Sequence, residues 1–581
     1  MQRLFVLLIL GSFVTLHPTR TLGADDIRTI VADYDAFARA LDPVRAAQRG
    51  DAAAARIWPD NSPAAVATRR TALQQFEQRL QTLPKTGLSV EDSLNRDLLL
   101  GRVRSGLEGL QFDEERLNFI SGDGFYTTAD YAALNTPLDS PADAENWIAR
   151  LEALPAYYEH ETANLRRGIE TGFTQPRRTV ARAIEDVRGQ LAQPAATTPL
   201  LAPFRNASRS FPADQLAAFE SRAEAALAGK VKPAQQALLA FLEREYLPAA
   251  RPQIGIGTLP QGKEYYAYLA RRHTSTAMSP AEIHALGERE VQRIRARMDE
   301  TIAQTGFKGS LQEFLASVRK DPRFYVDAAE YGRRCAEVAK RADFAMPKYF
   351  GRLPRLSYGV MPMPAGLESS ANGYLPGTPE QGVAGMVVYK PWMAEKMPTF
   401  GIPAWVLHEG VPGHHHQIAL SQELTDLPEF RRADDVTAYV EGWGLYSEYL
   451  GEEMGIYRDP YEQFGRLSLE MWRACRLVID TGMHVMGWSR ERAMACLQEN
   501  SALAQAEIEF EVDRYIAWPA QALAYKVGER KFIELRERAA QRLGAKFDVR
   551  EFHDLVLGAG PMPLDQVEAR VDRWSDARSR Q

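Results

Sequence analysis

The chain has 581 residues, of which 45% are hydrophobic, 25% charged and 9% aromatic, and its formal net charge is −6 from 70 basic and 76 acidic residues. This length and composition indicate an ordinary globular protein with two or more domains or lobes, and they exclude a fibrous or disordered chain. The small net charge and the lack of a long lysine or arginine run exclude an electrostatic surface for nucleic acid, so we expect no nucleic-acid partner.

The N-terminus has the features of an export signal. Arg3 supplies a positive charge, residues 4–16 are largely apolar, and small residues at 21–24 precede an acidic pair. The apolar stretch is too short to span a bilayer comfortably, although an uncleaved anchor or a buried helix is the alternative. Residues 1–24 are therefore predicted to be a cleaved signal peptide, with no stable membrane insertion afterwards.

Export has a consequence for the location of the mature protein. No cysteine lies near the cleavage region, which argues against a lipid-modified N-terminus. We expect the protein in the periplasm if the source is a Gram-negative bacterium, and secreted otherwise.

Residues 25–252 are predicted to form an N-terminal region of successive helices. Apolar residues recur there at three- and four-residue spacing, as between Ile27 and Leu41. Proline-containing joints separate the helices. No cluster in this region carries chemistry, so we expect it to be scaffold and one wall of a cleft.

A second region, residues 253–581, begins after a Gly/Pro-rich joint and is predicted to be the catalytic part. Two helices are expected at about 280–305 and 311–348, and short β-rich runs bounded by Gly and Pro follow within about 353–390. We expect these runs to form a small sheet. An edge strand there can pair with an extended peptide, and a purely structural hairpin has equal weight.

Three cysteines, Cys335, Cys475 and Cys496, lack any C-x-x-C spacing. A disulfide between two of them is one interpretation, and buried small apolar side chains are the other. A metal site built on thiolates is not supported.

The most informative segment reads His408-Glu409-Gly410-Val411-Pro412-Gly413-His414-His415-His416. Zinc hydrolases commonly place two histidines at i and i+4 on one helical face, with a glutamate beside the first as general base. Here the i+4 position is Pro412. Residues six apart in a regular helix lie about 9 Å apart along the axis and about 240° around it, so His408 and His414 cannot share a metal on a straight helix.

Pro412 itself indicates how the two histidines are brought together. Its ring clashes with the carbonyl of His408, four residues back, so a regular helix is disfavoured. We interpret Pro412-Gly413 as a two-residue bulge, which restores the i, i+4 relation between His408 and His414. Glu409 then remains beside the first ligand, where it can take a proton from water bound to Zn²⁺, the predicted cofactor.

The identity of the second ligand is left open among three histidines. His414 is favoured over His415 and His416 because only His414 leaves a compact bulge. A solvated histidine-rich patch is the alternative for the whole tract.

A later segment, Asp434 to Leu450, is helix-like and contains Glu441, 27 residues after His414. Zinc sites with two histidines and one glutamate take the third ligand from a following helix and leave one position open for water or substrate. Glu441 is the predicted third ligand. Glu448, two turns further along the same face, either orients a ligand or is solvated. The metal-site helices are thus expected within about 403–452.

Four segments together carry a resemblance to a known family: His408 to His415, Val440 to Trp443, Asp480 to His484, and Arg514-Tyr515 followed by Pro519 to Tyr525. In them the chain resembles the bacterial DUF885 family, which in turn resembles the gluzincin type of zinc metallopeptidase. The resemblance covers most of the mature chain. It implies a mainly α, zincin-like, helical two-lobed metallopeptidase fold with a small β-sheet next to the metal site.

Residues downstream of the ligands acquire roles from this resemblance and from chemical need. Attack of water on an amide develops an oxyanion, which calls for a donor besides the metal, and His484 and Tyr525 resemble such donors. Arg514 and Tyr515 are predicted to bind substrate, with the planar fork of Arg514 on a carboxylate. The alternative for each is a packed residue with one satisfied hydrogen bond.

The sequence therefore predicts an exported, mainly helical zinc hydrolase that acts as a peptidase on a peptide or small amide substrate. The preference for oligopeptides rests on family analogy. Two alternatives are a non-catalytic periplasmic binding or scaffold protein on the same fold and a zinc hydrolase of non-peptide amides or esters. Oligomeric state and the choice between endo- and exo-action are left open.

Overall fold

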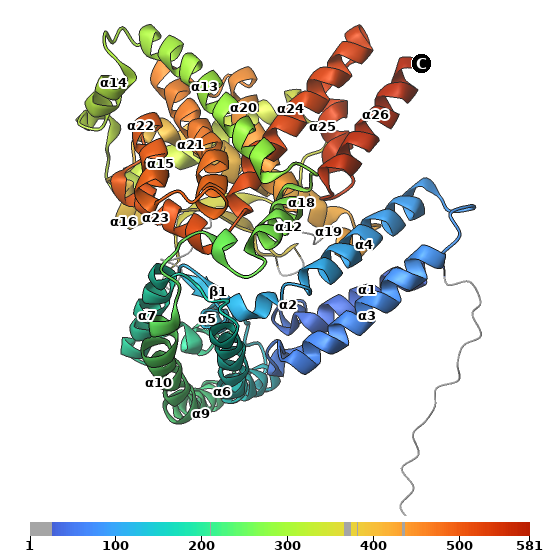
Figure 1. Ribbon diagram of the computed structural model, residues 1–581, viewed down its shortest axis with the longest axis vertical. Coiled ribbons are helices and arrows are strands. Elements are labelled where there is room, and N and C mark those ends of the chain that lie inside the picture. Colours follow the sequence, from blue (N-terminus) through green and yellow to red (C-terminus); the bar gives the residue numbers. More distant parts are fainter. Residues whose placement is uncertain (1–25, 209–210, 365–372, 380–381, 433–435, 581) are drawn as a thin grey trace, which may run out of the picture.

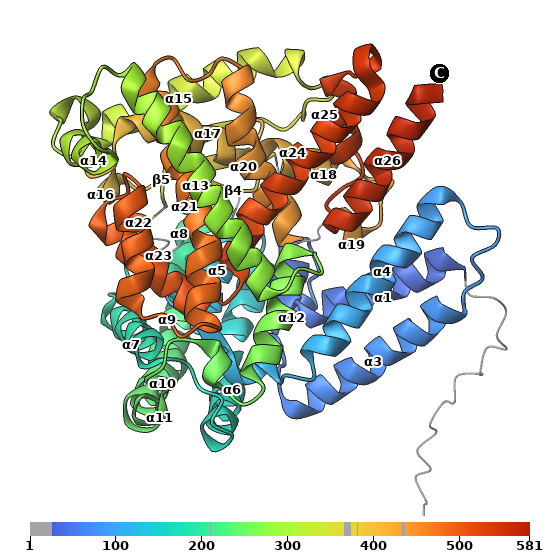
Figure 2. The same cartoon turned by 45° about the horizontal axis from the view of Figure 1, so that its top comes forward.

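The protein is mainly helical and has two small sheets, as seen from two directions in Figures 1 and 2. This confirms the mainly α fold class. The predicted signal peptide, residues 1–24, lies outside the described residues. The computed structural model describes residues 26–208, 211–364, 373–379, 382–432 and 436–580.

The N-terminal part is built of helices, as the apolar spacing predicts. Helices α1, α3 and α4 pack against one another, and the long helix α6 packs against α9 and α10. A short antiparallel hairpin of two strands joins the two groups. The elements are α1 (Ile27–Leu41), α2 (Pro43–Gln48), α3 (Pro63–Thr82), α4 (Val90–Gly109), β1 (Phe119–Ile120), β2 (Asp123–Gly124), α5 (Thr128–Leu134), α6 (Pro141–Glu170), α7 (Arg177–Ala192), α8 (Ala202–Arg205), α9 (Ala213–Ala226), α10 (Lys232–Phe241) and α11 (Leu247–Ala249).

The remaining part contains the second sheet and two helices of 25 residues each, α13 and α21. Helices α13 and α21 pack lengthwise, and α20 packs in the same way on α24. The elements are α12 (Gly262–Thr274), α13 (Pro280–Gln304), α14 (Leu311–Val318), α15 (Ala328–Ala345), β3 (Tyr358–Pro362), β4 (Tyr374–Leu375), β5 (Gly385–Tyr389), α16 (Pro391–Ala394), α17 (Ile402–Glu409), α18 (His414–Glu423), α19 (Glu429–Arg432), α20 (Thr437–Glu453), α21 (Pro460–His484), α22 (Arg490–Asn500), α23 (Gln505–Ala517), α24 (Ala524–Leu543), α25 (Val549–Leu557) and α26 (Leu564–Arg580).

The helix predicted at 311–348 is in fact two helices, α14 and α15. Pro322 lies between them, and a proline within a helix removes a hydrogen bond and clashes with the preceding turn. Asp327 then starts α15 because its side chain accepts a hydrogen bond from the Glu330 amide.

The apolar cores do not follow the boundary between the N-terminal part and the rest of the chain. One cluster is confined to residues between Trp58 and Ala250. Helices α1, α3 and α4 instead share a core with α20, α24 and α26. The first helices of the chain therefore support the same core as the helices that carry the predicted metal site.

The predicted small sheet is present and has three strands in the order β3-β5-β4. Strand β5 pairs with β3 in parallel and with β4 in antiparallel orientation. The two β-rich runs seen in the sequence, β3 and β5, are therefore not a hairpin. The sheet lies next to the histidine segment because the Tyr374 hydroxyl on β4 is 3.0 Å from His415 Nδ1 on α18.

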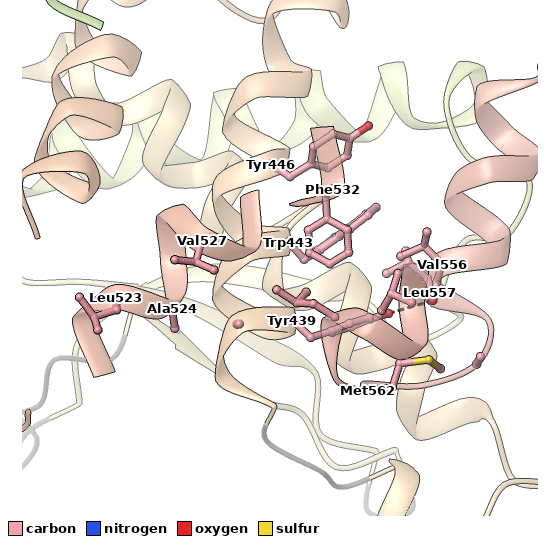
Figure 3. Packing of buried hydrophobic residues seen from close by; sticks show 14 of the residues in the cluster. Tyr439, Trp443, Tyr446, Leu523, Ala524, Val527, Phe532, Val556, Leu557 and Met562 are labelled. Atoms are coloured by element: carbon pink, nitrogen blue, oxygen red, sulfur yellow. Dashed lines mark hydrogen bonds between the residues drawn. The ribbon is translucent and has the colours of Figure 1, made fainter. Parts of the chain in front are cut away.

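Helix α20, which carries Glu441, is fixed by its packing on α24, as Figure 3 shows. Tyr439, Trp443 and Tyr446 recur at four- and three-residue spacing on one face and are fully buried. Phe532 of α24 lies 5.6 Å, centroid to centroid, from the rings of both Tyr439 and Trp443. These aromatic contacts set the position of the helix relative to the core.

Two glycines allow these helices to cross closely. A Cβ atom added to Gly528 on α24 would overlap the carbonyl oxygen of Ala438, and one added to Gly442 on α20 would overlap Gly528. Because the overlapped atoms belong to the main chain, a larger residue forces the helices apart.

We therefore expect Gly528→Ala to destabilise the protein by about 1–3 kcal/mol, the usual cost of overpacking. The measurement is the apparent unfolding temperature followed by circular dichroism. Gly101→Ala on α4 is the matched control, since a Cβ there meets no atom within 4 Å. The control should be neutral or stabilising by up to about 1 kcal/mol. Equal effects of the two substitutions would contradict the close crossing.

The cysteines follow the disulfide interpretation. Cys475 on α21 and Cys496 on α22 form a disulfide, with Cα atoms 6.1 Å apart, and Cys335 is free and buried. Among the residues that the structure describes, no helix is long and apolar enough to cross a membrane.

Candidate metal centre

The histidine segment consists of two helices with a break between them. Helix α17 ends at Glu409 and α18 begins at His414. Gly410 and Gly413 leave the helical conformation, with ψ angles of −126° and −129°. The Gly413 amide donates a hydrogen bond to the Leu407 carbonyl over 3.0 Å, and a Cβ on Gly413 would overlap that oxygen. The predicted bulge within one continuous helix is therefore wrong: the helix stops, turns tightly at glycine and starts again.

The break nevertheless brings His408 and His414 together. Their ring centroids lie 4.6 Å apart and nearly perpendicular, and Glu441 Oε2 is 3.5 Å from His408 Nε2 and 3.4 Å from His414 Nε2. Ligands at about 2.1 Å from a tetrahedral zinc are about 3.4 Å apart, so the spacing fits one shared ion. Glu441 Oε2 is also a buried carboxylate oxygen without a hydrogen-bond partner among the described residues. A cation would satisfy it.

The other two histidines of the tract point to different partners. His415 Nε2 donates to the Leu356 carbonyl, so its Nδ1 accepts from the Tyr374 hydroxyl, and both nitrogens are used. His416 Nε2 donates to the Arg352 carbonyl. Of the three candidates, only His414 joins His408 and Glu441.

Helix α20 presents a stripe of three residues to His408. Glu441, Gly444 and Glu448 are three and four residues apart, which places them on one face. Glu441 lies at His408 Nε2, and Glu448 Oε1 accepts a hydrogen bond of 2.8 Å from His408 Nδ1. Between them the imidazole lies against Gly444, where a Cβ would approach its Cε1 atom to 2.7 Å.

Glu448 fixes the tautomer of His408. Because an ionised carboxylate only accepts hydrogen bonds, Nδ1 must carry the proton, and the Nε2 lone pair is left for a metal. Arg473 on α21 holds Glu448 in turn, at 3.3 Å. Arg473 is thus a salt-bridge partner of Glu448.

We expect Glu448→Gln to lower zinc affinity by about 10- to 100-fold, because carboxylates that orient ligating histidines contribute that much. Competition with a chromogenic chelator measures it. Glu453→Gln, at the exposed end of the same helix, is the control, since Glu453 pairs with Arg536 and does not contact His408. Unchanged affinity in the Glu448 variant would show that His408 is oriented by packing alone.

Glu409 lies beside the cluster, on the last turn of α17. Its carboxylate packs against the main chain of Gly373, immediately before β4, and a Cβ on Gly373 would overlap it. Burial raises the pKa of Glu409 above its usual range. Burial also opposes ionisation of Glu441, but His408 and His414 outweigh it and hold the pKa of Glu441 well below its usual range. The two carboxylates therefore lie in different electrostatic surroundings.

The two predicted oxyanion donors differ in position. The Tyr525 ring on α24 lies 6.3 Å from the His408 ring and nearly parallel to it, and its hydroxyl has one long hydrogen bond, 3.4 Å, from Gln521. His484 has both ring nitrogens engaged by the main chain: Nδ1 accepts from Ile256 N–H and Nε2 donates to the Tyr515 carbonyl. Tyr525 is available as a donor beside the cluster, whereas His484 fastens α21 to neighbouring segments.

The residues predicted to bind substrate have internal partners. Arg514 pairs with Glu511 and donates to Gln521 Oε1 over 2.9 Å. The Tyr515 hydroxyl donates to Glu511 and accepts from Arg476 Nε, each within 2.7 Å. Neither side chain is left free for a substrate.

Three acidic side chains also lie close together at a second, buried place in the protein. Glu290, Glu470 and Glu529 are buried and close enough to hold a metal. However, the Lys526 ammonium lies 2.5–3.2 Å from a carboxylate oxygen of each. The lysine already occupies the position that a cation would take, so this group is a buried ion-pair network.

A large cavity of about 1430 Å³ lies between the N-terminal helices and the rest of the protein. Residues of α1, α3 and α4 line one side, and residues of α12 and α26 line the other. Its lining includes Thr437, one turn before Glu441, but none of the three clustered residues. The N-terminal helices thus form a wall of a cavity that ends near the start of α20.

One known family matches most of the chain. The family described as "Bacterial protein of unknown function (DUF885)" matches residues 43–571. The chain belongs to the DUF885 family. This confirms the resemblance to DUF885 noted in the sequence, whereas the further resemblance to gluzincin peptidases stays a prediction.

Two solved structures are similar to this DUF885 protein over nearly its whole length. One is described as a "putative lipoprotein" from Colwellia psychrerythraea: it is 26% identical, covers 95% of this chain and 100% of its own, and has a TM-score of 0.88. Another, from Shewanella oneidensis, is a "putative lipoprotein of unknown function" with 17% identity, coverage of 94% and 99%, and a TM-score of 0.69. The similarity to a "putative oligoendopeptidase F" of Bacillus anthracis, with 11% identity and a TM-score of 0.27, is too low to indicate a shared fold. No curated protein matches the chain.

Proposed function

We propose that this DUF885 protein is a zinc-dependent hydrolase that cleaves amide bonds in oligopeptides. The observation that carries the proposal is the convergence of His408 Nε2, His414 Nε2 and a Glu441 oxygen, with Glu409 near enough to interact electrostatically with all three. Structural zinc sites have four protein ligands, whereas hydrolytic ones have three and an open position. Helices α17, α18 and α20 each supply one ligand here, and three ligands are the number expected of a hydrolytic site.

The bound zinc would polarise the scissile carbonyl and lower the pKa of a water molecule. Glu409 takes a proton from that water as its oxygen bonds to the carbonyl carbon, and returns the proton to the amine nitrogen as the C–N bond breaks. A raised pKa suits a group that must both accept and release a proton near neutral pH. The Tyr525 hydroxyl donates a hydrogen bond to the developing oxyanion.

Export is part of the same proposal. The two similar structures are each described as a "putative lipoprotein", and lipoproteins are exported proteins. In this chain the cysteines are at 335, 475 and 496, so none is near the predicted cleavage region. We therefore propose an exported protein released by cleavage after residue 24.

The test is to purify the mature protein, measure its metals and screen it on a peptide library together with amino-acyl esters and amides. We expect about one zinc per chain and peptide hydrolysis that a chelator abolishes and zinc restores. Protein without metal and without hydrolysis would favour a binding or scaffold role. Hydrolysis of esters but not peptides would favour a zinc hydrolase of non-peptide substrates. Iron in place of zinc would overturn the assignment, since two histidines and a carboxylate also bind Fe(II).

A further inference from the structure

Arg476 on α21 has a charged group that the protein does not fully satisfy. Its side chain is 3% exposed. Nε donates to the Tyr515 hydroxyl over 2.7 Å and Nη2 to Glu511 Oε2 over 3.0 Å. Nη1 is buried and has no hydrogen-bond partner among the described residues. A buried charged donor without a partner is costly, so the position calls for a ligand that accepts.

The charges around Arg476 are also unbalanced. Arg476 and Arg514 share one carboxylate, Glu511, at 3.0 and 2.9 Å. Among the described side chains, no other carboxylate lies within salt-bridge distance of either guanidinium. Arg514 donates to Glu511 and, through Nη1, to Gln521, so of the two guanidinium groups that of Arg476 is the one with an unpartnered donor. One net charge and one free donor group suit a monoanion.

The unsatisfied guanidinium lies close to the metal cluster. Arg476 Cζ is 4.3 Å from the centroid of the Tyr525 ring, and that ring is 6.3 Å from the His408 imidazole. The guanidinium and the imidazole are separated by no more than these two distances together, which about three extended residues span. A bound peptide would use part of this length for its contact with the guanidinium and part for its contact with the metal cluster. One or two residues of the extended peptide therefore fit between the two contacts.

We propose that Arg476 binds the free C-terminal carboxylate of a peptide, so that cleavage at the cluster releases one or two residues from the carboxyl end. A carboxylate that accepts from Nη1 supplies both the missing hydrogen bond and the missing negative charge. The carboxylate-binding role predicted for Arg514 is therefore assigned to Arg476 instead. Arg476 contacts the Tyr525 ring, which in turn lies beside the His408 imidazole. This inference rests on the hydrolase function proposed above and adds the substrate class and the direction of cleavage.

The first test needs no variant and uses the zinc-loaded protein. Pairs of N-acylated peptides of three to six residues are compared, identical except for a C-terminal acid or amide. We expect kcat/KM at least about 30-fold higher for the acid, and products shortened by one or two residues at the carboxyl end. Equal cleavage of both forms, or cleavage at internal bonds only, would overturn the inference while leaving the hydrolase standing. Cleavage of neither form would instead remove the proposed function.

The second test measures binding without turnover, in the Glu409→Gln background, by isothermal titration with the same peptides. The acid should bind at least about 30-fold more tightly than the amide, Arg476→Gln should abolish the difference, and Arg476→Lys should restore part of it. Arg466→Gln is the control: Arg466 is equally buried on α21 but pairs with Glu470, and its loss should leave the acid-to-amide ratio unchanged. A difference that persists in Arg476→Gln would overturn the assignment. Equal affinity for the acid and the amide in the Glu409→Gln protein with Arg476 intact would also overturn the inference. It would show that Nη1 binds only a buried water.

Discussion

Replacing Glu409 by glutamine is expected to lower peptide turnover by at least about a thousandfold without loss of zinc. Glutamine has the same shape but can neither accept the proton of the attacking water nor pass it to the leaving amine, and general acid–base catalysis contributes about 10²- to 10⁴-fold. Glu409 packs against Gly373, so an isosteric residue keeps that contact. The measurement is kcat on the best peptide from the library, with zinc content determined on the same sample.

The matched control for Glu409 is Glu423→Gln, at the other end of the histidine segment. Glu423 is the last residue of α18, and its carboxylate accepts a hydrogen bond from the Arg355 amide. We expect turnover and zinc content to stay at the level of the unsubstituted protein. Full turnover in the Glu409 variant with zinc in place would remove the general-base role from Glu409.

The second large effect is expected from the consecutive histidines. His414→Ala should lower zinc affinity by more than about a hundredfold, since the loss of a ligand exceeds the loss of a residue that merely orients one. His408→Ala and Glu441→Ala should have the same effect. His415→Ala and His416→Ala should retain zinc, because their Nε2 atoms donate to main-chain carbonyls.

These variants also separate metal loss from unfolding. His415 and His416 are buried and hydrogen-bonded, so their removal should destabilise the fold by about 1–3 kcal/mol each. Zinc is therefore measured by dialysis against a metal buffer on protein whose circular dichroism is intact. Zinc retained in His414→Ala and lost in His415→Ala would reverse the assignment of the second ligand.

The sequence indicated which residues meet at the candidate metal centre better than it indicated the backbone that brings them together. A proline at the i+4 position correctly indicated that the helix containing His408 could not continue undisturbed. It could not show whether the chain makes a bulge or a full break, because both place His414 near His408. The decisive residues are Gly410 and Gly413, whose main-chain conformations end one helix and begin the next.

Contacts between distant segments could not be predicted from the sequence. Glu448 was a candidate to orient a ligand, but its hydrogen bond with His408 depends on how α17 crosses α20. The role of Gly444 depends on the same crossing. Its position three residues after Glu441 is the one feature of the sequence that could have indicated this role. The role of Arg476 likewise depends on its neighbours in the fold. Its unsatisfied nitrogen appears once Glu511 is seen to serve two arginines.

The fold was predictable at the level of helices but not of their assembly. Apolar spacing indicated the helices, and Gly- and Pro-bounded runs indicated β3 and β5. Strand β4 has two residues, too few for a periodic signal, and its pairing with β5 is a tertiary contact. The shared core of α1, α3 and α4 with α20 and α24 also joins segments more than 300 residues apart, beyond the range of any local pattern.

The central claim is that one zinc ion binds where α17, α18 and α20 meet. The most direct test is X-ray diffraction from crystals of the zinc-loaded protein at energies on either side of the zinc absorption edge. We expect a single strong anomalous peak about 2.1 Å from His408 Nε2, His414 Nε2 and a Glu441 carboxylate oxygen. A map without a peak there, or with its zinc peak among Glu290, Glu470 and Glu529, would contradict the claim.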